Sequence, residues 1–594
     1  MPVRIERTEV GRRELALLVA GACLLSVVMH WPLVLHLGTD VPKDLGDPLV
    51  QSWQVAWDGN ALAHQPLDFF QANQFWPLRD TLAFSDALIG YAPAGLIGSG
   101  PEASVARYDV LFLLAYALAF VGAYLLAREL GVGYVGAAVA GAAFAFAPFR
   151  LEQDGHMHII SSGGIPLALA LGIRGYRLGR PWVVVAGFCV AAWQVSLGFS
   201  LGLPLAYLIA VLGLLAAVRW VRAGRPSVPR SLAIATLAGA LVFAGTAVLL
   251  SRPYARVQEE HPNIRRSAET VENFSGPPEV FLVAPDENAL WGGATAGLRD
   301  GLENVPEKTL FPGLVTVALA LGGLVAAVLP RGLRIGLGLG VLVVSVLALG
   351  FQTEDGLLWP YRIAYEALPG VDGIRAPGRL VTFSSLGLAL LAGAGAEAAR
   401  RWLTARGSAR APGGGRRWGL APAAPAAFAA VLVLGVVVEG RGLPFDPFDD
   451  QAQPAVPEAP ASFAAIPAPQ LHLPAERPED NRRYLLWSTD GFPATVNGRS
   501  SLDPVFTAQL IAAVRGFPDA ASVELLQRLG VRSVVLHPRR AAGTPWERAV
   551  QHPVAGLPLE RERKGDVVVY EILSPSAGAG TAIAASAVSE RRSR

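Results

Sequence analysis

Residues 15–37 read LALLVAGACLLSVVMHWPLVLHL, and residues 39–57 just after them read TDVPKDLGDPLVQSWQVAW. The first stretch is apolar and longer than the roughly 20 residues that a helix needs to cross the hydrocarbon core of a bilayer. It is too long for the apolar part of a signal peptide, so we interpret it as an uncleaved membrane anchor. The acidic stretch then begins a loop at the membrane surface.

The composition indicates that the whole chain is a membrane protein. Of its 594 residues, 52% are hydrophobic and 16% are charged, and the mean hydropathy is +0.39, which is outside the range of soluble globular proteins. No basic patch resembles a nucleic-acid-binding surface. Eleven segments are apolar and long enough to cross a bilayer: 15–37, 106–127, 132–149, 157–173, 181–198, 199–218, 231–250, 310–329, 334–351, 379–398 and 418–438.

Arginine is divided unevenly among the loops between these segments. The arginine-rich loops fall on the side of the N-terminus, which the positive-inside rule identifies as cytoplasmic. The exception is 251–309, which carries five arginines but more acids than bases and is near the length at which the rule loses force. Their arginines are Arg128, Arg174, Arg177, Arg180, those of 219–230, Arg331, Arg334 and those of 400–417. The outer loops are then 38–105, 150–156, 251–309 and 352–378. Lysine occurs only three times, a bias typical of G+C-rich bacteria, so we expect a multi-pass protein of a bacterial inner membrane.

One further apolar stretch, AFSDALIGYAPAGLIG at 83–98, is predicted not to cross. If it crossed, every later arginine-rich loop would change sides, against the charge bias of the chain. The stretch is short and contains Ser85, Asp86 and Pro93. We therefore expect a helix that lies in the membrane interface or enters it only partway.

The end of the chain has a different composition. Residues 439–478, after a membrane domain of 1–438, form a Pro/Ala-rich linker, and residues 479–594 have the pattern of a small extracytoplasmic α/β domain. RYLLWS (483–488), VRSVVLH (531–537) and DVVVYEIL (566–573) predict strands, and ASVELLQRLG (521–530) predicts a helix that ends at a glycine. We expect disorder from about residue 575. The predicted fold class is a mainly α polytopic membrane protein of about eleven transmembrane helices plus an interfacial helix and this α/β domain.

The first outer loop carries two carboxylates, Asp44 and Asp47, close to the predicted membrane boundary. Asp47 precedes a proline at the start of an apparent amphipathic helix, so a helix cap is one interpretation of it. A general base is the other. Trp53 and Trp57 follow on this helix, where they could stack on a sugar or serve as interfacial anchors.

The second outer loop, FRLEQDGHMHIISS (149–162), crowds charged and imidazole side chains into a short connection. Ionisable residues at a membrane boundary are candidates for function. Asp154, His156 and His158 are the candidates here, and a satisfied polar loop is the alternative. The two histidines and one aspartate form an incomplete ligand set for zinc.

The fourth outer loop ends GVDGIRAPGRLVTFSS, with Arg375 and Arg379 on either side of a Pro-Gly turn. Two guanidinium groups at headgroup level suit a phosphate, which arginine binds through paired hydrogen bonds. The alternative is that both side chains reach to the phosphates of the bulk lipid.

Several of these pieces together resemble the GT-C superfamily of membrane glycosyltransferases. They are DLGDPLVQSWQVAW, GHMHI, ALPGVDGIRAPGRL and VNGRSS…FPDAASVELLQRLGVRSVVLH, and they are similar to large bacterial members that include YfhO-like proteins. The chain departs from the superfamily pattern in two places. Asp44 and Asp47 stand apart where many members have adjacent Asp-Glu, and Asp154 and His156 stand where many have one aspartate.

The resemblance implies transfer of a sugar from a polyprenyl-phosphate carrier to a glycan, lipid or protein acceptor on the outer face. Asp47 or Asp44 would be the general base, and Arg375 or Arg379 would stabilise the departing phosphate. His156 or Asp154 would position the acceptor or a divalent cation, Mg²⁺ or Mn²⁺. A single base opposite the leaving group predicts inversion at the anomeric carbon.

A non-enzymatic protein that handles lipid-linked glycans, such as a flippase, transporter or assembly scaffold, is the alternative to the glycosyltransferase. Transporters place charges or broken helices near the bilayer midplane. The predicted spans of this chain are almost free of ionisable residues, and polar groups collect in the outer loops. This distribution favours chemistry at the membrane surface.

Overall fold

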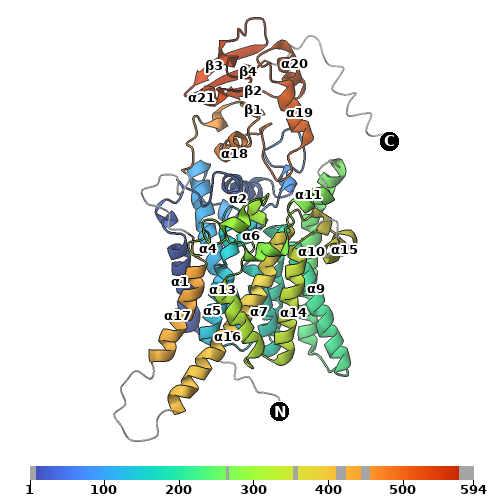
Figure 1. The fold of residues 1–594 in the computed structure, drawn as a ribbon. Helices are drawn as coiled ribbons and strands as arrows, with labels where there is room; N and C mark the ends of the chain where they lie inside the picture. The colour runs from blue at the N-terminus through green and yellow to red at the C-terminus, as the bar shows by residue number, and fades with distance from the viewer. Residues whose placement is uncertain (1–8, 262–266, 352–358, 410–422, 443–454, 574–594) are drawn as a thin grey trace.

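A computed structural model of the chain describes residues 9–261, 267–351, 359–409, 423–442 and 455–573. A bundle of long helices forms one part, and a small α/β domain lies at one end of the bundle (Figure 1). Helix α2 (Asp47–His64) and the short helix α6 (Met157–Ile160) lie at that same end.

A helix lies in each of the eleven segments that the sequence marks as apolar. These helices are α1 (Arg12–Met29), α4 (Gly100–Glu129), α5 (Tyr134–Ala145), α7 (Gly164–Leu178), α8 (Pro181–Ser196), α9 (Phe199–Arg222), α10 (Arg230–Glu260), α13 (Leu314–Val325), α14 (Arg331–Ala348), α16 (Val381–Ala409) and α17 (Ala423–Glu439). By length and composition, six helices of the described chain can cross a membrane. The chain is therefore a multi-pass membrane protein, while eleven crossings stay a prediction.

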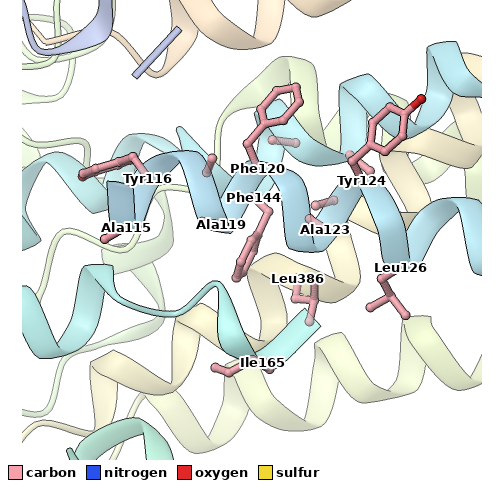
Figure 2. Close-up of a cluster of buried hydrophobic side chains, with 14 of the residues drawn as sticks. Ala115, Tyr116, Ala119, Phe120, Ala123, Tyr124, Leu126, Phe144, Ile165 and Leu386 are labelled. Atoms are coloured by element: carbon pink, nitrogen blue, oxygen red, sulfur yellow. The ribbon is translucent and has the colours of Figure 1, made fainter. Parts of the chain in front are cut away.

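Close helix contacts build the core of the bundle. Glycines permit them: a Cβ on Gly122 of α4 would lie 2.6 Å from the carbonyl oxygen of Gly163, and one on Gly136 of α5 would lie 2.2 Å from that of Gly393. Small residues allow such approaches in membrane helices, where packing drives association. Figure 2 shows aromatic side chains of α4 and α5, among them Phe120 and Phe144, filling the space between the helices.

The stretch 83–98 is not the single interfacial helix that its apolar composition predicts. It contains the end of one 3₁₀ turn, η2 (Thr81–Phe84), all of a second, η3 (Ile89–Tyr91), and one helical turn, α3 (Ala92–Gly95). Asp86 interrupts it, because its carboxylate accepts hydrogen bonds from the Phe199 amide (2.7 Å) and the Ser200 hydroxyl (2.5 Å) at the start of α9. No element in this stretch is long enough to cross a bilayer.

The α/β domain contains a four-stranded sheet in the order β1-β2-β4-β3. Strand β2 (Ser533–Leu536) pairs in parallel with β1 (Gln470–Leu473) and antiparallel with β4 (Val567–Ile572), which pairs with β3 (Leu559–Lys564). The strands predicted at 531–537 and 566–573 are confirmed, as is the helix α20 (Ala520–Arg528). Strand β1 lies inside the stretch 439–478, so this part of the predicted linker belongs to the sheet. The predicted disordered tail lies outside the described residues.

The strand predicted for RYLLWS was wrong. Residues 483–487 belong to helix α18 (Pro478–Trp487), and Ser488 caps its end. Pro478 begins this helix, and two acidic residues stabilise its first turn. Tyr484 and Leu485 are adjacent in sequence and both fully buried. They can both be buried because α18 lies between the sheet and α2, so its apolar residues face two layers rather than one.

Candidate functional site

Three outer loops meet around one lysine. The Lys43 ammonium lies 2.7 Å from an oxygen of Glu287 in the third outer loop and 3.3 Å from an oxygen of Glu152 in the second. Burial acts to lower the pKa of Lys43, but the two carboxylates outweigh it and raise the pKa above its usual value. The loops that the arginine pattern assigns to one side thus lie together at one end of the bundle.

Asp47 of the first loop faces His156 of the second. Asp47 Oδ2 lies 3.5 Å from His156 Nε2, and the Asp47 side chain is 49% exposed. Asp47 is the first residue of α2, where Gly46 holds the cap position, and its side chain makes no capping hydrogen bond. The structure therefore gives Asp47 no capping role.

Gln153 determines which nitrogen of His156 carries the proton. Its amide nitrogen donates to the carbonyl oxygen of Pro306 (3.0 Å), so its amide oxygen faces His156 Nδ1, also at 3.0 Å. Nδ1 must then be the protonated nitrogen. His156 Nε2 is left with a lone pair directed at the Asp47 carboxylate. Two hydrogen-bond acceptors converge here, so a hydroxyl group placed against them can donate its single hydrogen to one of them or share it between both.

Asp44 is exposed and lies in the same turn as Asp47. Its Oδ1 accepts a hydrogen bond from the amide of Gly46 at 2.7 Å. This bond folds the Asp44 carboxylate back onto its own turn. Of the two carboxylates, Asp47 is the one that faces a partner from another loop.

Arg379 is clamped between Glu307 and His158. Its Nε lies 3.0 and 3.1 Å from the two oxygens of Glu307, and one terminal nitrogen donates to His158 Nε2 at 2.9 Å. Burial acts to raise the pKa of Glu307, but the Arg379 guanidinium outweighs it and holds the pKa at about 2. Asp86 Oδ2 lies 3.8 Å from the same His158 nitrogen.

Arg375 is the second cation of the fourth outer loop. Its guanidinium lies over the ring of Phe274, 4.7 Å from the ring centre. Burial, and after it the charge of Arg379, lower the pKa of Arg375. Within the described residues, no carboxylate lies at ion-pair distance from it. Arg375 is therefore a cation available to a ligand.

Three other predicted residues are placed elsewhere. Asp154 accepts a hydrogen bond from the Tyr116 hydroxyl, and burial raises the pKa of Asp154 to about 8. The indole nitrogen of Trp53 donates to Asn73 (2.9 Å), and that of Trp57 donates to the carbonyl oxygen of Phe69 (3.2 Å). Both indoles are buried against the α/β domain. The structure does not bring these three side chains to the pair of Asp47 and His156.

Sequence reasoning missed Glu307, Gln153 and Asp86. Glu307 ends the 3₁₀ turn η7 (Val305–Glu307), just before the span predicted at 310–329. A carboxylate at a membrane boundary was the signal that marked Asp47, and it applies equally to Glu307. The same signal applies to Asp86, which stands in an apolar stretch at the predicted interface. Gln153 gives no comparable signal, because it is uncharged and its role depends also on Pro306, which is distant in sequence.

A metal ion has no complete set of ligands here. Among the residues that the structure describes, no three carboxylate, imidazole or thiol side chains are grouped so that they could hold one. Asp47 and His156 form only a pair, and Asp44 is turned toward Gly46. The chemistry below is derived from the side chains alone.

We expect His156 to make the protein sensitive to acid. Burial, and after it the charge of Arg379, lower the pKa of His156 from 6.5 to about 4. In the unfolded chain His156 becomes protonated near pH 6.5, whereas in the folded protein it stays neutral until about pH 4. The free energy of unfolding therefore decreases as the pH falls from 6.5 to about 4. Melting temperatures at pH 7.5 and 4.5 should differ less for His156→Gln than for the wild type. His64→Gln, which alters an exposed histidine at the far end of α2, should leave the difference unchanged.

Comparison with solved structures identifies the fold. No family model and no curated protein matches the sequence. A mutant of the arabinofuranosyltransferase AftD from mycobacteria matches with a TM-score of 0.51 and 15% identity, over 96% of this chain and 42% of that one. This chain therefore spans less than half the length of AftD.

Two other matches have lower TM-scores. ArnT from Cupriavidus metallidurans bound to undecaprenyl phosphate gives 0.47 at 15% identity, over 95% of this chain and 99% of that one. The apo oligosaccharyltransferase of Archaeoglobus fulgidus gives 0.43 at 15% identity, over 88% and 69%. The likeness to AftD shows that the chain has a GT-C-type fold, as the sequence resemblance predicts.

Proposed function

We propose that the protein is a membrane glycosyltransferase that moves a sugar from a polyprenyl-phosphate carrier to an acceptor hydroxyl on the outer face of a bacterial inner membrane. One observation carries the proposal: the Asp47 carboxylate and the unprotonated nitrogen of His156 lie 3.5 Å apart at the exposed start of α2. Arg375 and Arg379 lie in the same group of loops, and their charges reach Asp47. A base and a cationic site for a phosphate are the two parts that such a transfer requires.

In the proposed reaction, the acceptor hydroxyl lies against the pair of Asp47 and His156 and donates its hydrogen to the Asp47 carboxylate. Asp47 takes the hydroxyl proton while the oxygen forms a bond to the anomeric carbon of the sugar. The bond from that carbon to the carrier phosphate breaks, and its electron pair stays on the phosphate oxygen. Arg375 stabilises the charge that develops there. Because the acceptor attacks opposite the leaving group, the product has the inverted configuration.

Glu307 and His158 have a positioning role in this proposal. Glu307 neutralises Arg379 and fixes its guanidinium, and Arg379 in turn holds the His158 ring. Arg375 lacks such a partner in the described part of the chain, so it keeps its charge available for the phosphate. Rigid support of this kind is what preorganised stabilisation of a leaving group needs.

The direct test uses the full chain in lipid nanodiscs with polyprenyl phosphates that carry radiolabelled hexoses or pentoses. Release of free polyprenyl phosphate together with an inverted glycoside would support the proposal. Binding of the carrier without release, across the panel of sugars and acceptors, would favour the non-enzymatic alternative. A product with retained configuration would contradict a single-base reaction.

The proposed topology makes a separate prediction. Leu67 in the first outer loop is 98% exposed, and Ser227 lies in the exposed turn between α9 and α10 at the opposite end of the bundle. In a protein without Cys23 and Cys189, a membrane-impermeant maleimide should label Leu67→Cys in intact spheroplasts. It should label Ser227→Cys only after the membrane is opened. The reverse pattern would put the candidate site in the cytoplasm.

A further inference from the structure

The α/β domain is joined to the first outer loop by backbone hydrogen bonds. The amide of Thr495 donates to the carbonyl oxygen of Asn73 (2.7 Å), and that of Trp76 donates to Thr495 (2.8 Å). The amide of Phe75 donates to Asn497 at 3.1 Å. This pairing ties the domain to the same loop that contains α2 and Asp47, so the domain and the candidate site form one unit.

The segment that follows, 498–503, is fixed against the first outer loop. Gly498 lies on the ring of Phe75, where a Cβ would come within 2.5 Å of a ring carbon. The Arg499 amide donates to the side-chain oxygen of Gln74 (3.2 Å). The hydroxyl of Ser501 lies 3.1 Å from that of Ser85, the residue next to Asp86. Segment 498–503 is therefore anchored one residue from a carboxylate of the site.

Arg499 extends from this anchored segment. Its guanidinium pairs with Asp503, which also accepts the amide hydrogen of Ser500 at 3.0 Å, and the side chain remains about one-third exposed. The anchored segment lies beside Arg379, because Asp86, which follows Ser85, lies 3.8 Å from the His158 nitrogen that Arg379 contacts at 2.9 Å. The charge of Arg499 also lowers the pKa of Arg375, after burial and Arg379. An anion bound between two like charges lowers their repulsion, and a phosphate there would compete with Asp503 for the Arg499 guanidinium.

We propose that Arg499 of the α/β domain is a substrate-binding residue that, together with Arg375, holds the phosphate of the polyprenyl carrier. This inference rests on the proposed function and gives the domain a direct part in it. In this proposal the membrane domain supplies Asp47 and Arg375, and the α/β domain supplies Arg499 on the outer side of the phosphate site. An arginine is suited to this role, since its planar group can bind two phosphate oxygens at once.

The test measures the binding of farnesyl phosphate to the full chain in detergent, with uncharged farnesol as the matched ligand. Farnesyl phosphate should raise the melting temperature of the wild type more than farnesol does. Arg499→Gln should weaken farnesyl phosphate binding about tenfold, the size of one lost charge-assisted hydrogen bond, and should leave farnesol binding unchanged. Arg499→Lys should recover part of the loss. Arg515→Gln, which alters an exposed arginine paired with Glu476 in the same domain, should bind as the wild type does.

The outcomes separate this inference from the proposed function. If the wild type binds farnesyl phosphate no better than farnesol, the polyprenyl-phosphate donor itself is wrong. If the wild type prefers farnesyl phosphate and Arg499→Gln binds farnesyl phosphate as tightly as the wild type does, the polyprenyl-phosphate donor is still supported but the role proposed for Arg499 is wrong. The melting temperatures of the variants without ligand show whether each one folds. If Arg499→Gln does not fold, the binding of farnesyl phosphate to Arg499→Lys provides the test.

Discussion

Replacing Asp47 with asparagine is expected to lower the rate of glycosyl transfer by roughly two to four orders of magnitude, the usual contribution of general base catalysis. The amide has nearly the same shape as the carboxylate but cannot take the proton of the acceptor hydroxyl. The Asp47 side chain is half exposed and makes no capping hydrogen bond, so the variant should fold normally. The measurement is the initial rate with a polyprenyl-phosphate sugar, alongside the melting temperature.

Asp44→Asn is the matched control for this variant. Asp44 lies three positions earlier, is also exposed, and directs an oxygen at the amide of its own turn rather than at His156. An amide oxygen can accept that hydrogen bond as the carboxylate does, so we expect a much smaller loss of rate. If Asp44→Asn lost as much activity as Asp47→Asn, both carboxylates would belong to the reacting site. Full activity of the double variant would rule out the proposed base altogether.

The arrangement of the outer loops could be predicted from the sequence because it follows from charge. The arginines of the opposite end decide which loops share a side, even though several of them are paired. Glu129, for example, accepts hydrogen bonds from both Arg174 and Arg177. The positive-inside rule counts basic residues rather than net charge, so such pairing does not weaken it. That topology permits Asp47 to meet His156, and the packing of the helices brings the two side chains to 3.5 Å.

The errors fall where local pattern and tertiary packing disagree. The apolar run of RYLLWS predicted a strand, but α18 is buried on two sides, and burial on two sides removes the alternation that distinguishes helix from strand. Trp53 and Trp57 carry the aromatic signal of a sugar site, yet the α/β domain covers both. The sequence allowed that domain to cover the outer face of the membrane part, but it did not indicate which residues of the first loop the domain would bury.

The contact between Glu307 and Arg379 was beyond sequence reasoning for a different reason. Two whole spans separate the residues along the chain, and their outer loops contain other acids and bases that could have paired. Only the packing of the helices selects this pair. Because this ion pair is buried, removing one partner leaves the other charge unpaired and out of reach of water, which costs free energy.

Glu307→Gln is therefore expected to destabilise the protein by about 3 to 5 kcal/mol, the range for a broken buried ion pair. The Glu307 and Arg379 side chains are 5% and 10% exposed, so solvent screens the remaining charge weakly. The variant should also lose transfer activity, because a free Arg379 no longer holds His158 in place. Chemical denaturation in detergent measures the first effect, and the initial rate measures the second.

A second Arg–Glu pair of this chain supplies the control. Arg362 and Glu366 lie one helical turn apart on α15 (Trp359–Ala367), at 71% and 61% exposure. Exposed pairs of this kind contribute about 0.5 kcal/mol, so Glu366→Gln should change little. Adding Arg379→Gln to Glu307→Gln should recover stability, because the uncompensated charge is then gone. If Glu307→Gln and Glu366→Gln lowered the free energy of unfolding equally, water would have to reach Arg379. The arrangement of Arg379 held between Glu307 and His158 would then not exist in the membrane.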